Sequence, residues 1–144
     1  MVDIDFLEIN KGSKLIIANF VNLSTKCKEY IQTNLDYVIY EHDHKYLPNR
    51  NPAEYDNYLA PADKIINKAF FEKSKYVFCQ STFHSDIVKK NLHIENIVNL
   101  GGNLWSNDAL NMMRELARKE KSDKCSIMYS NIEHKNTSGA VRYC

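Results

Sequence analysis

The sequence predicts an α/β domain built on a parallel sheet that helices flank, and three observations support this class. Short apolar runs rich in β-branched and aromatic residues recur along the chain, as expected for strands covered on both faces. Segments with helical periodicity lie between these runs. The composition is that of one globular domain, with 144 residues of which 44% are hydrophobic and 26% charged. Strands that alternate with helices favour right-handed βαβ units and therefore a Rossmann-like fold.

Five segments have the composition of buried strands. The central one is a continuous apolar run that begins at Tyr37 and is followed at once by charged residues. Residues 1–13 open with alternating apolar and acidic side chains, which allows a further edge strand. The five predicted strands cover residues 14–20, 37–40, 75–80, 96–100 and 124–130.

Helical segments lie between and after these strands, and each begins at a side chain suited to accept hydrogen bonds from the first backbone amides. We predict Ser24 or Asn22 as the first cap, Ser81 or Thr82 as the third, and Ser106 as the fourth. The predicted helices cover residues 25–33, 62–73, 82–92 and 107–121, and Asn136 and Thr137 begin a last one. The inward face of the fourth helix is predicted to carry Leu110, Met113, Leu116 and Ala117.

Residues 45–61 contain all three prolines of the chain and keep no periodicity. A long irregular loop in a compact domain is usually functional or disordered. Its three tyrosines, Tyr46, Tyr55 and Tyr58, favour an ordered loop that packs against the domain or binds a ligand.

Charge and cysteine content exclude several classes of partner. With 19 basic and 18 acidic residues the net charge is +1, so the basic excess of a nucleic-acid-binding surface is absent. No apolar run approaches the roughly 18 residues of a membrane span, and no signal peptide is visible. The spacing of the four cysteines fits neither a metal site nor a dense disulfide framework. We therefore expect reduced thiols and a cytoplasmic protein.

Familiar catalytic motifs do not occur in this sequence. It contains no glycine-rich dinucleotide fingerprint, no phosphate-binding loop, no serine elbow, no paired-cysteine motif and no zinc-binding helix motif. Nucleophilic catalysis by serine or cysteine has no support, and no cofactor is expected.

The cluster after the central strand is the main candidate site. An imidazole that titrates near neutral pH at a strand end suits acid–base work or hydrogen bonding to a sugar, which points to His42 and Asp43. A simpler interpretation is a solvated strand end with ion pairs to Lys45 or Arg50. A third interpretation is a metal site, in which His42 and His44 are joined by His84 or Cys79.

Three further loops lie after predicted strands. The turn at Ser81 and His84 either caps a helix or faces the binding edge. Gly101 and Gly102, followed by Asn103, either permit a turn or let a ligand approach the backbone closely. The loop that contains Asn131 and Lys135 leads into a helix start and could hold a phosphate.

Four segments, considered by their order and spacing, point to a known family. They are Val38-Ile-Tyr-Glu-His-Asp43, the strand–turn–helix at 76–87, Ile97-Val-Asn-Leu-Gly-Gly-Asn103, and Ser126-Ile-Met-Tyr-Ser-Asn131 followed by Lys135 and Asn136. Together they resemble the retaining, nucleotide-sugar-using glycosyltransferases of the GT-B fold. The first is similar to that family's strand ending in His-Asp, and the last to the opening of its second domain. The resemblance covers residues 14–144.

The resemblance implies a Rossmann-like acceptor-side domain of the GT-B N-terminal type over residues 1–121. Residues 122–144 are then the start of a truncated donor-side domain, and we expect the chain to be a fragment of a longer enzyme or a degenerate remnant of one. Its implied function is transfer of a sugar from a nucleotide-sugar donor to a saccharide or other acceptor. Since that family's second domain supplies most of the donor site, the isolated chain should not catalyse transfer.

The predicted site residues follow from these arguments. His42 and Asp43 are predicted to be catalytic, with His42 near the transferred sugar. Asn131 and Lys135 are predicted to bind the donor phosphates. The predicted substrate-binding residues are His44, Ser81, His84, Gly101, Gly102 and Asn103.

Two alternatives stay open. One is a non-catalytic Rossmann-like binding or assembly module whose tyrosine-rich loop contacts a protein. The other is a metal-dependent hydrolase that uses His42, His44 and His84.

Overall fold

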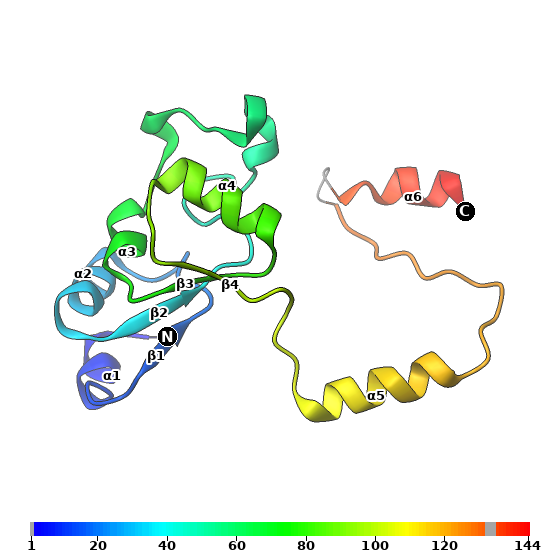
Figure 1. Cartoon of the computed structure of the whole chain (residues 1–144), viewed down its shortest axis with the longest axis horizontal. Coiled ribbons are helices and arrows are strands. Elements are labelled where there is room, and N and C mark those ends of the chain that lie inside the picture. The colour runs from blue at the N-terminus through cyan, green and yellow to red at the C-terminus, as the bar shows by residue number, and fades with distance from the viewer. Residues whose placement is uncertain (1, 132–134) are drawn as a thin grey trace. The chain divides into compact units, whose positions relative to one another are not determined.

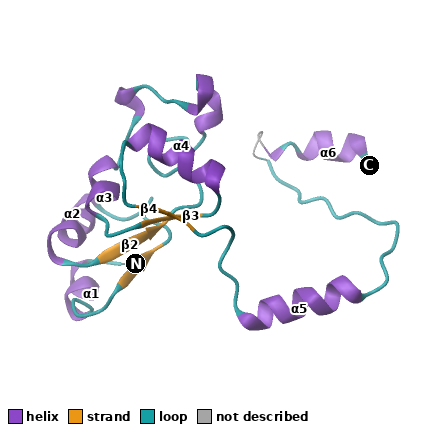
Figure 2. Cartoon of the chain, viewed as in Figure 1, coloured by secondary structure: helices purple, strands orange, loops and turns teal. Residues whose placement is uncertain are grey.

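The chain forms an α/β structure around one parallel sheet. We describe it from a computed structural model that covers residues 2–131 and 135–144. All strand pairs are parallel and the strands lie side by side in chain order, which confirms the Rossmann-like class (Figure 2). The strands are β1 (Leu15–Ile17), β2 (Tyr37–Tyr40), β3 (Val77–Cys79) and β4 (Ile97–Asn99).

The strand order places the crossover helices on one side of the sheet. Right-handed crossovers between parallel strands that follow one another in sequence all pass over the same face. Figure 1 shows these helices on a common side of the strands. They are α2 (Thr25–Asn34), α3 (Lys68–Lys73) and α4 (Thr82–Leu92).

The hydrophobic core lies between this face and the helices. Alternate residues of β2 and β3 are buried in it, as the period of two in a strand requires. The Phe20 ring centroid lies 4.9 Å from that of Phe70 and 5.6 Å from that of Phe71. Burial of these apolar groups is the main stabilising term for the domain. The buried strand residues are Tyr37, Ile39, Val77 and Cys79.

The opposite face of the sheet carries apolar side chains that remain accessible. Ile16 of β1 is 69% exposed and Tyr76, just before β3, is 44% exposed. The rings of Tyr76 and Phe78 stack with their centroids 6.3 Å apart, and both line a cavity of about 300 Å³. The prediction that the strands are covered on both faces is therefore wrong for the described part of this domain.

Serine caps define where three helices begin. The side-chain oxygens of Ser24, Ser81 and Ser106 accept hydrogen bonds of 3.1–3.2 Å from backbone amides three residues later. These bonds confirm the predicted caps of α2, α4 and a later helix, α5 (Asn107–Arg118). Each such cap typically stabilises its helix by about 1 kcal/mol.

The N-terminal segment is helical, so the expected edge strand is wrong. It forms α1 (Ile4–Ile9), with the Asp3 side chain accepting a hydrogen bond of 2.9 Å from the Phe6 amide. Leu7 enters the core at 2% exposure. The alternation of apolar and acidic residues is overridden because Asp3 caps a helix that buries Leu7.

The helix predicted over residues 62–73 is only half formed. A 3₁₀ turn covers Ala62–Lys64, and Asn67, at φ 56°, separates it from α3. Tertiary hydrogen bonds explain the break. The Ile66 amide donates to the Tyr46 carbonyl at 2.8 Å, and the Asn67 side chain donates to the Lys45 carbonyl at 2.9 Å.

The proline-rich loop 45–61 is ordered, as its tyrosines predict. Tyr46 is fully buried and belongs to the core. Asn91 of α4 holds the far end of the loop, accepting from the Ala60 amide at 2.9 Å and donating to the Tyr58 carbonyl at 2.8 Å. Short 3₁₀ turns lie at Pro52–Glu54 and Asp56–Tyr58.

The chain divides into two units, Met1–Asn103 and Leu104–Cys144. The second contains α5 and α6 (Thr137–Tyr143), and the Asn136 side chain caps α6 as predicted. In the part of the chain that the structure describes, no helix has both the length and the apolar character required to cross a membrane.

Two predictions for this second unit are wrong. Residues 124–130 form no strand, and Cys125 is exposed instead of buried. The predicted inward face of α5 is not buried either, with Leu116 47% exposed. A strand forms beside a neighbouring strand that satisfies its backbone groups, and no strand among the described residues pairs with this segment. A domain boundary at residue 121 stays a prediction.

Candidate functional site

The candidate site lies at the carboxyl end of β2, where the chain leaves the sheet. The backbone amide of Glu41 donates a hydrogen bond of 2.9 Å to the Phe78 carbonyl, so the sheet pairing extends one residue past β2. The Glu41 side chain is fully buried. The chain then turns, and His44 adopts the left-handed conformation at φ 55°.

One carboxylate oxygen of Glu41 organises this turn. Its Oε1 accepts hydrogen bonds from the backbone amides of His42, Asp43 and Lys45 at 3.0, 2.8 and 3.4 Å. Amides that leave a sheet need an acceptor when they are buried, and a charged acceptor binds them more strongly. The backbone that carries His42 is therefore held from inside the domain.

Lys45 brings a second buried charge to the turn. Its side chain is 1% exposed, and its Nζ is paired with Asp43 Oδ1. The same Nζ lies 3.5 Å from Glu41 Oε1 and 3.4 Å from His42 Nδ1. It also lies 5.9 Å from the centroid of the Phe20 ring. Two carboxylates thus compensate the ammonium, as a buried charge requires.

Both oxygens of the Asp43 carboxylate are engaged. One pairs with Lys45, and the other accepts a hydrogen bond of 2.9 Å from Arg50. Burial on its own raises the pKa of Asp43. The hydrogen bond and charge of Lys45, the charge of His42 and the hydrogen bond from Arg50 outweigh it and hold the pKa below its usual value. The ion pairs that the simpler interpretation expected are therefore present.

His42 is exposed and belongs to a group of polar side chains at the strand ends. The Tyr40 hydroxyl lies 3.3 Å from Asn103 Oδ1, and the Gln80 amide lies 3.4 Å from the Tyr40 hydroxyl. Gln80 also donates to Asn103. The His42 ring centroid is 6.0 Å from that of Tyr40. We call Tyr40, His42, Gln80 and Asn103 the strand-end polar cluster.

Two members of this cluster were not predicted as site residues. Tyr40 and Gln80 are the last residues of the predicted strands 37–40 and 75–80. Tyr40 follows the fully buried Ile39, so its side chain points to the face opposite the core. Their position at the strand ends was the signal that could have identified them.

His44 and His84 contact each other. Their ring centroids are 4.6 Å apart, and His44 Nδ1 lies 3.0 Å from the Tyr46 hydroxyl. Burial, followed by the His84 ring, lowers the pKa of His44 to about 4. Burial also lowers the pKa of His84, although the charge of Glu41 opposes it. Both rings are therefore neutral at pH 7.

The remaining predicted residues of this edge have local structural roles. The Ser81 hydroxyl is used as the cap of α4. Gly101 has φ 69°, and its amide donates to the Asn99 side chain at 2.9 Å. A Cβ atom at Gly101 or Gly102 would meet nothing within 4 Å. The positive φ therefore accounts for Gly101, and a contact with substrate stays a prediction.

The metal interpretation lacks a ligand cluster. Within residues 2–131 and 135–144, no group of three or more His, Cys, Asp or Glu side chains is arranged to hold a metal ion. Burial raises the pKa of the Cys79 thiol to about 12, so this thiol is neutral at pH 7. A neutral thiol is a poor metal ligand.

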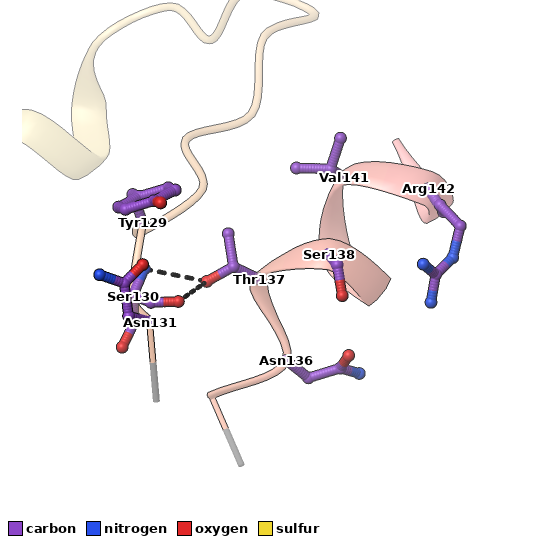
Figure 3. Close-up of a pocket in the computed structure, with 8 residues that line it drawn as sticks. All are labelled: Tyr129, Ser130, Asn131, Asn136, Thr137, Ser138, Val141 and Arg142. Atoms are coloured by element: carbon purple, nitrogen blue, oxygen red, sulfur yellow. Dashed lines mark hydrogen bonds between the residues drawn. The ribbon is translucent and has the colours of Figure 1, made fainter. Parts of the chain in front are cut away.

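The predicted phosphate-binding residues lie in the second unit. Asn131 lines a cavity of about 760 Å³, which Figure 3 shows between the segment at Tyr129 and α6. Thr137, the first residue of α6, connects the helix to this segment. Its hydroxyl accepts a hydrogen bond from the Ser130 amide at 3.0 Å and donates one to the Ser130 carbonyl at 3.2 Å. Lys135 is exposed and does not line the cavity, whereas Arg142 does.

The fold and the strand-end polar cluster define a Rossmann-like α/β domain with a hydrogen-bonding edge. No family of known proteins, no curated protein and no solved structure matches this chain. The link to glycosyltransferases therefore rests on the four sequence segments.

Proposed function

We propose that this chain is the acceptor-side part of a glycosyltransferase that moves a sugar from a nucleotide-sugar donor to a saccharide or other acceptor. Residues 1–121 are the acceptor-side domain in this proposal, and residues 122–144 begin the donor-side domain. The strand-end polar cluster is the observation that supports it most. It gathers an imidazole, a phenol and two carboxamides at the carboxyl ends of parallel strands, where α/β folds bind ligands.

These groups match the chemistry of a sugar. A sugar hydroxyl both donates and accepts hydrogen bonds, and the carboxamides, the phenol and the imidazole can do the same. His42 contacts the transferred sugar from a turn that Glu41 holds rigid. Catalysis rests on positioning and on electrostatic stabilisation of an oxocarbenium-like sugar and the departing diphosphate.

Other predicted residues take supporting roles. Asp43 is the second catalytic residue in this proposal, and its ion pairs with Lys45 and Arg50 support a fixed position for its carboxylate. Asn131 and Lys135 hold the donor phosphates. The protein works in the cytoplasm, where thiols stay reduced, and Cys27, Cys79, Cys125 and Cys144 are all free.

Ligand titration of the 144-residue chain tests this proposal. Monosaccharides and nucleotide sugars are added while NMR signals of the strand-end polar cluster are followed. We expect shifts at Tyr40, Gln80 and Asn103. His42→Asn should weaken binding about fivefold, as loss of one hydrogen bond worth about 1 kcal/mol requires. The matched control is His93→Asn, which replaces an imidazole at the end of α4 and should leave binding unchanged.

The same experiment separates the proposal from the non-catalytic module. The module interpretation expects that no nucleotide sugar shifts these signals, either in the parent chain or in the two variants. We also expect these 144 residues alone to transfer no sugar, because in this proposal they hold only the start of the donor-side domain. Transfer of a labelled sugar by the purified chain would contradict the fragment interpretation.

A further inference from the structure

We propose that Glu41 and Lys45 are the positioning residues of the His42 site. The buried carboxylate holds the backbone of the turn, and the buried ammonium selects the ring nitrogen of His42 that carries the proton. This inference rests on the proposed function, because it explains how the site presents His42 to a ligand. Neither residue is among the site residues predicted from the sequence.

Glu41 acts on the backbone. Its side chain is fully buried, and a single oxygen receives the amides of His42 and Asp43 at 3.0 and 2.8 Å. Without this acceptor both amides would need water that a buried side chain excludes. The position of the His42 Cα is therefore coupled to a group with no access to solvent.

Lys45 acts on the ring. An ammonium group can only donate hydrogen bonds, and its Nζ lies 3.4 Å from His42 Nδ1. This contact is favourable when Nδ1 is unprotonated and repulsive when it carries a proton. The competing neighbour is the Tyr40 carbonyl, 3.5 Å from the same nitrogen, which would accept a proton from it. A hydrogen bond from an ammonium group is stronger than one to a neutral carbonyl, so Lys45 is the stronger influence.

The consequence is a defined tautomer. The neutral His42 ring carries its proton on Nε2, the nitrogen that receives no hydrogen bond from the described residues. The exposed ring therefore offers an N–H donor at its outer nitrogen. Such a donor is directed at an oxygen of the ligand, and the two buried residues set that direction without touching the ligand.

The test of the Lys45 role is ¹⁵N NMR of the histidine rings in the full 144-residue chain. Spectra are recorded at pH about 8.5, above the ordinary histidine pKa of about 6.5, and His42→Asn assigns the His42 signals. We expect the parent to carry its proton on Nε2. In Lys45→Met the tautomer ratio should shift toward the Nδ1-protonated form, because only the Tyr40 carbonyl remains. Lys26→Met, at an exposed lysine of α2, should leave the ratio unchanged.

The Lys45 variant leaves buried carboxylates uncompensated and can fail to fold. Glu41→Gln combined with Lys45→Met removes both charges but keeps an acceptor oxygen, so it should fold and show the same shift. A parent ring protonated on Nδ1, or an unchanged ratio in the folded double variant, would overturn the Lys45 role.

The Glu41 role is tested by a matched pair of double variants. Glu41→Leu with Lys45→Met removes the acceptor, whereas Glu41→Gln with Lys45→Met retains it. Amide hydrogen exchange at His42 and Asp43 should be faster in the first than in the second. Equal exchange rates would overturn the Glu41 role. None of these measurements needs a sugar. The titration can therefore contradict the proposed function while the positioning roles hold, and the variants can contradict the positioning roles while sugar binding is observed.

Discussion

At the scale of single residues, the carboxyl end of β2 gathers ionisable side chains that have little contact with water. Glu41 and Lys45 are both buried, and they compensate each other within the turn. His44 and His84 respond to the same burial in the opposite way, by losing their charge. At the two imidazoles the effect of burial outweighs that of the nearby carboxylates of Glu41 and Asp43, so these rings stay neutral.

The neutral histidines predict a loss of stability in mild acid. The pKa of His44 is about 4 in the folded chain, compared with about 6.5 when unfolded. As pH falls from about 6.5 toward 4, the unfolded chain therefore binds more protons and folding becomes less favourable. His84 contributes in the same direction. Urea unfolding at pH 7.0 and at about pH 5 should show a lower midpoint at the lower pH.

Two variants at positive φ separate this effect from general acid sensitivity. His44 and His93 both have φ 55°, a conformation that asparagine tolerates. His44→Asn should reduce the pH dependence, whereas His93→Asn should keep it. Equal slopes in the two variants would contradict the assignment to His44.

At the scale of elements, α4 both covers the core and holds loop 45–61 in place. Its buried residues Val88 and Leu92 cover the sheet, and Asn91 between them binds the loop that precedes α3. Asn91 makes three hydrogen bonds, to the Ala60 amide and to the Tyr58 and Ile87 carbonyls. One helix therefore orders both the core and the far end of loop 45–61.

Removing the Asn91 side chain should loosen the loop. Asn91→Ala leaves the buried Ala60 amide without its acceptor, which should cost about 1–3 kcal/mol of unfolding free energy. Hydrogen exchange at the Ala60 amide should accelerate more than exchange in β2. The control is Asn34→Ala, an exposed asparagine at the end of α2. An Ala60 amide that stays as protected as in the parent would contradict this role.

At the scale of the whole molecule, the buried core belongs to one unit. Its members run from Leu7 to Ile94, all within Met1–Asn103. The described residues of Leu104–Cys144 contribute no buried side chain to either of their helices. Stability should therefore reside in the first unit, because apolar burial is its main source.

A chain that ends at Asn103 should fold on its own. We expect cooperative thermal unfolding with a midpoint within a few degrees of the 144-residue chain, since none of the buried core is removed. Circular dichroism and calorimetry of the two polypeptides measure this directly. A 1–103 chain that is unfolded, or that melts more than about 10 °C lower, would show that later residues are needed.

Much of the fold could be predicted because local signals and tertiary packing agree there. The strands at 37–40 and 96–100 and the caps Ser24, Ser81 and Ser106 are set by nearby residues. The segment 62–73 could not be predicted, since hydrogen bonds to a distant loop interrupt its helical periodicity.

The candidate site was only partly predictable for a similar reason. His42 and Asn103 stand at strand ends and were identified from the sequence. Tyr40 and Gln80 were not predicted because they belong to apolar strand patterns. That the Tyr40 hydroxyl and the Gln80 amide lie close together follows only from the register of β2 and β3. The interactions of Glu41 depend on the turn geometry, which the sequence pattern does not specify.

The strand order also bears on how the protein is made. Because β1 to β4 lie in the sheet in the order in which they are synthesised, each strand pairs with one that has already left the ribosome. No strand has to be inserted between two earlier ones. The sheet can therefore grow from one edge as translation proceeds, with the most recent strand as the growing edge and β1 as the opposite, constant edge.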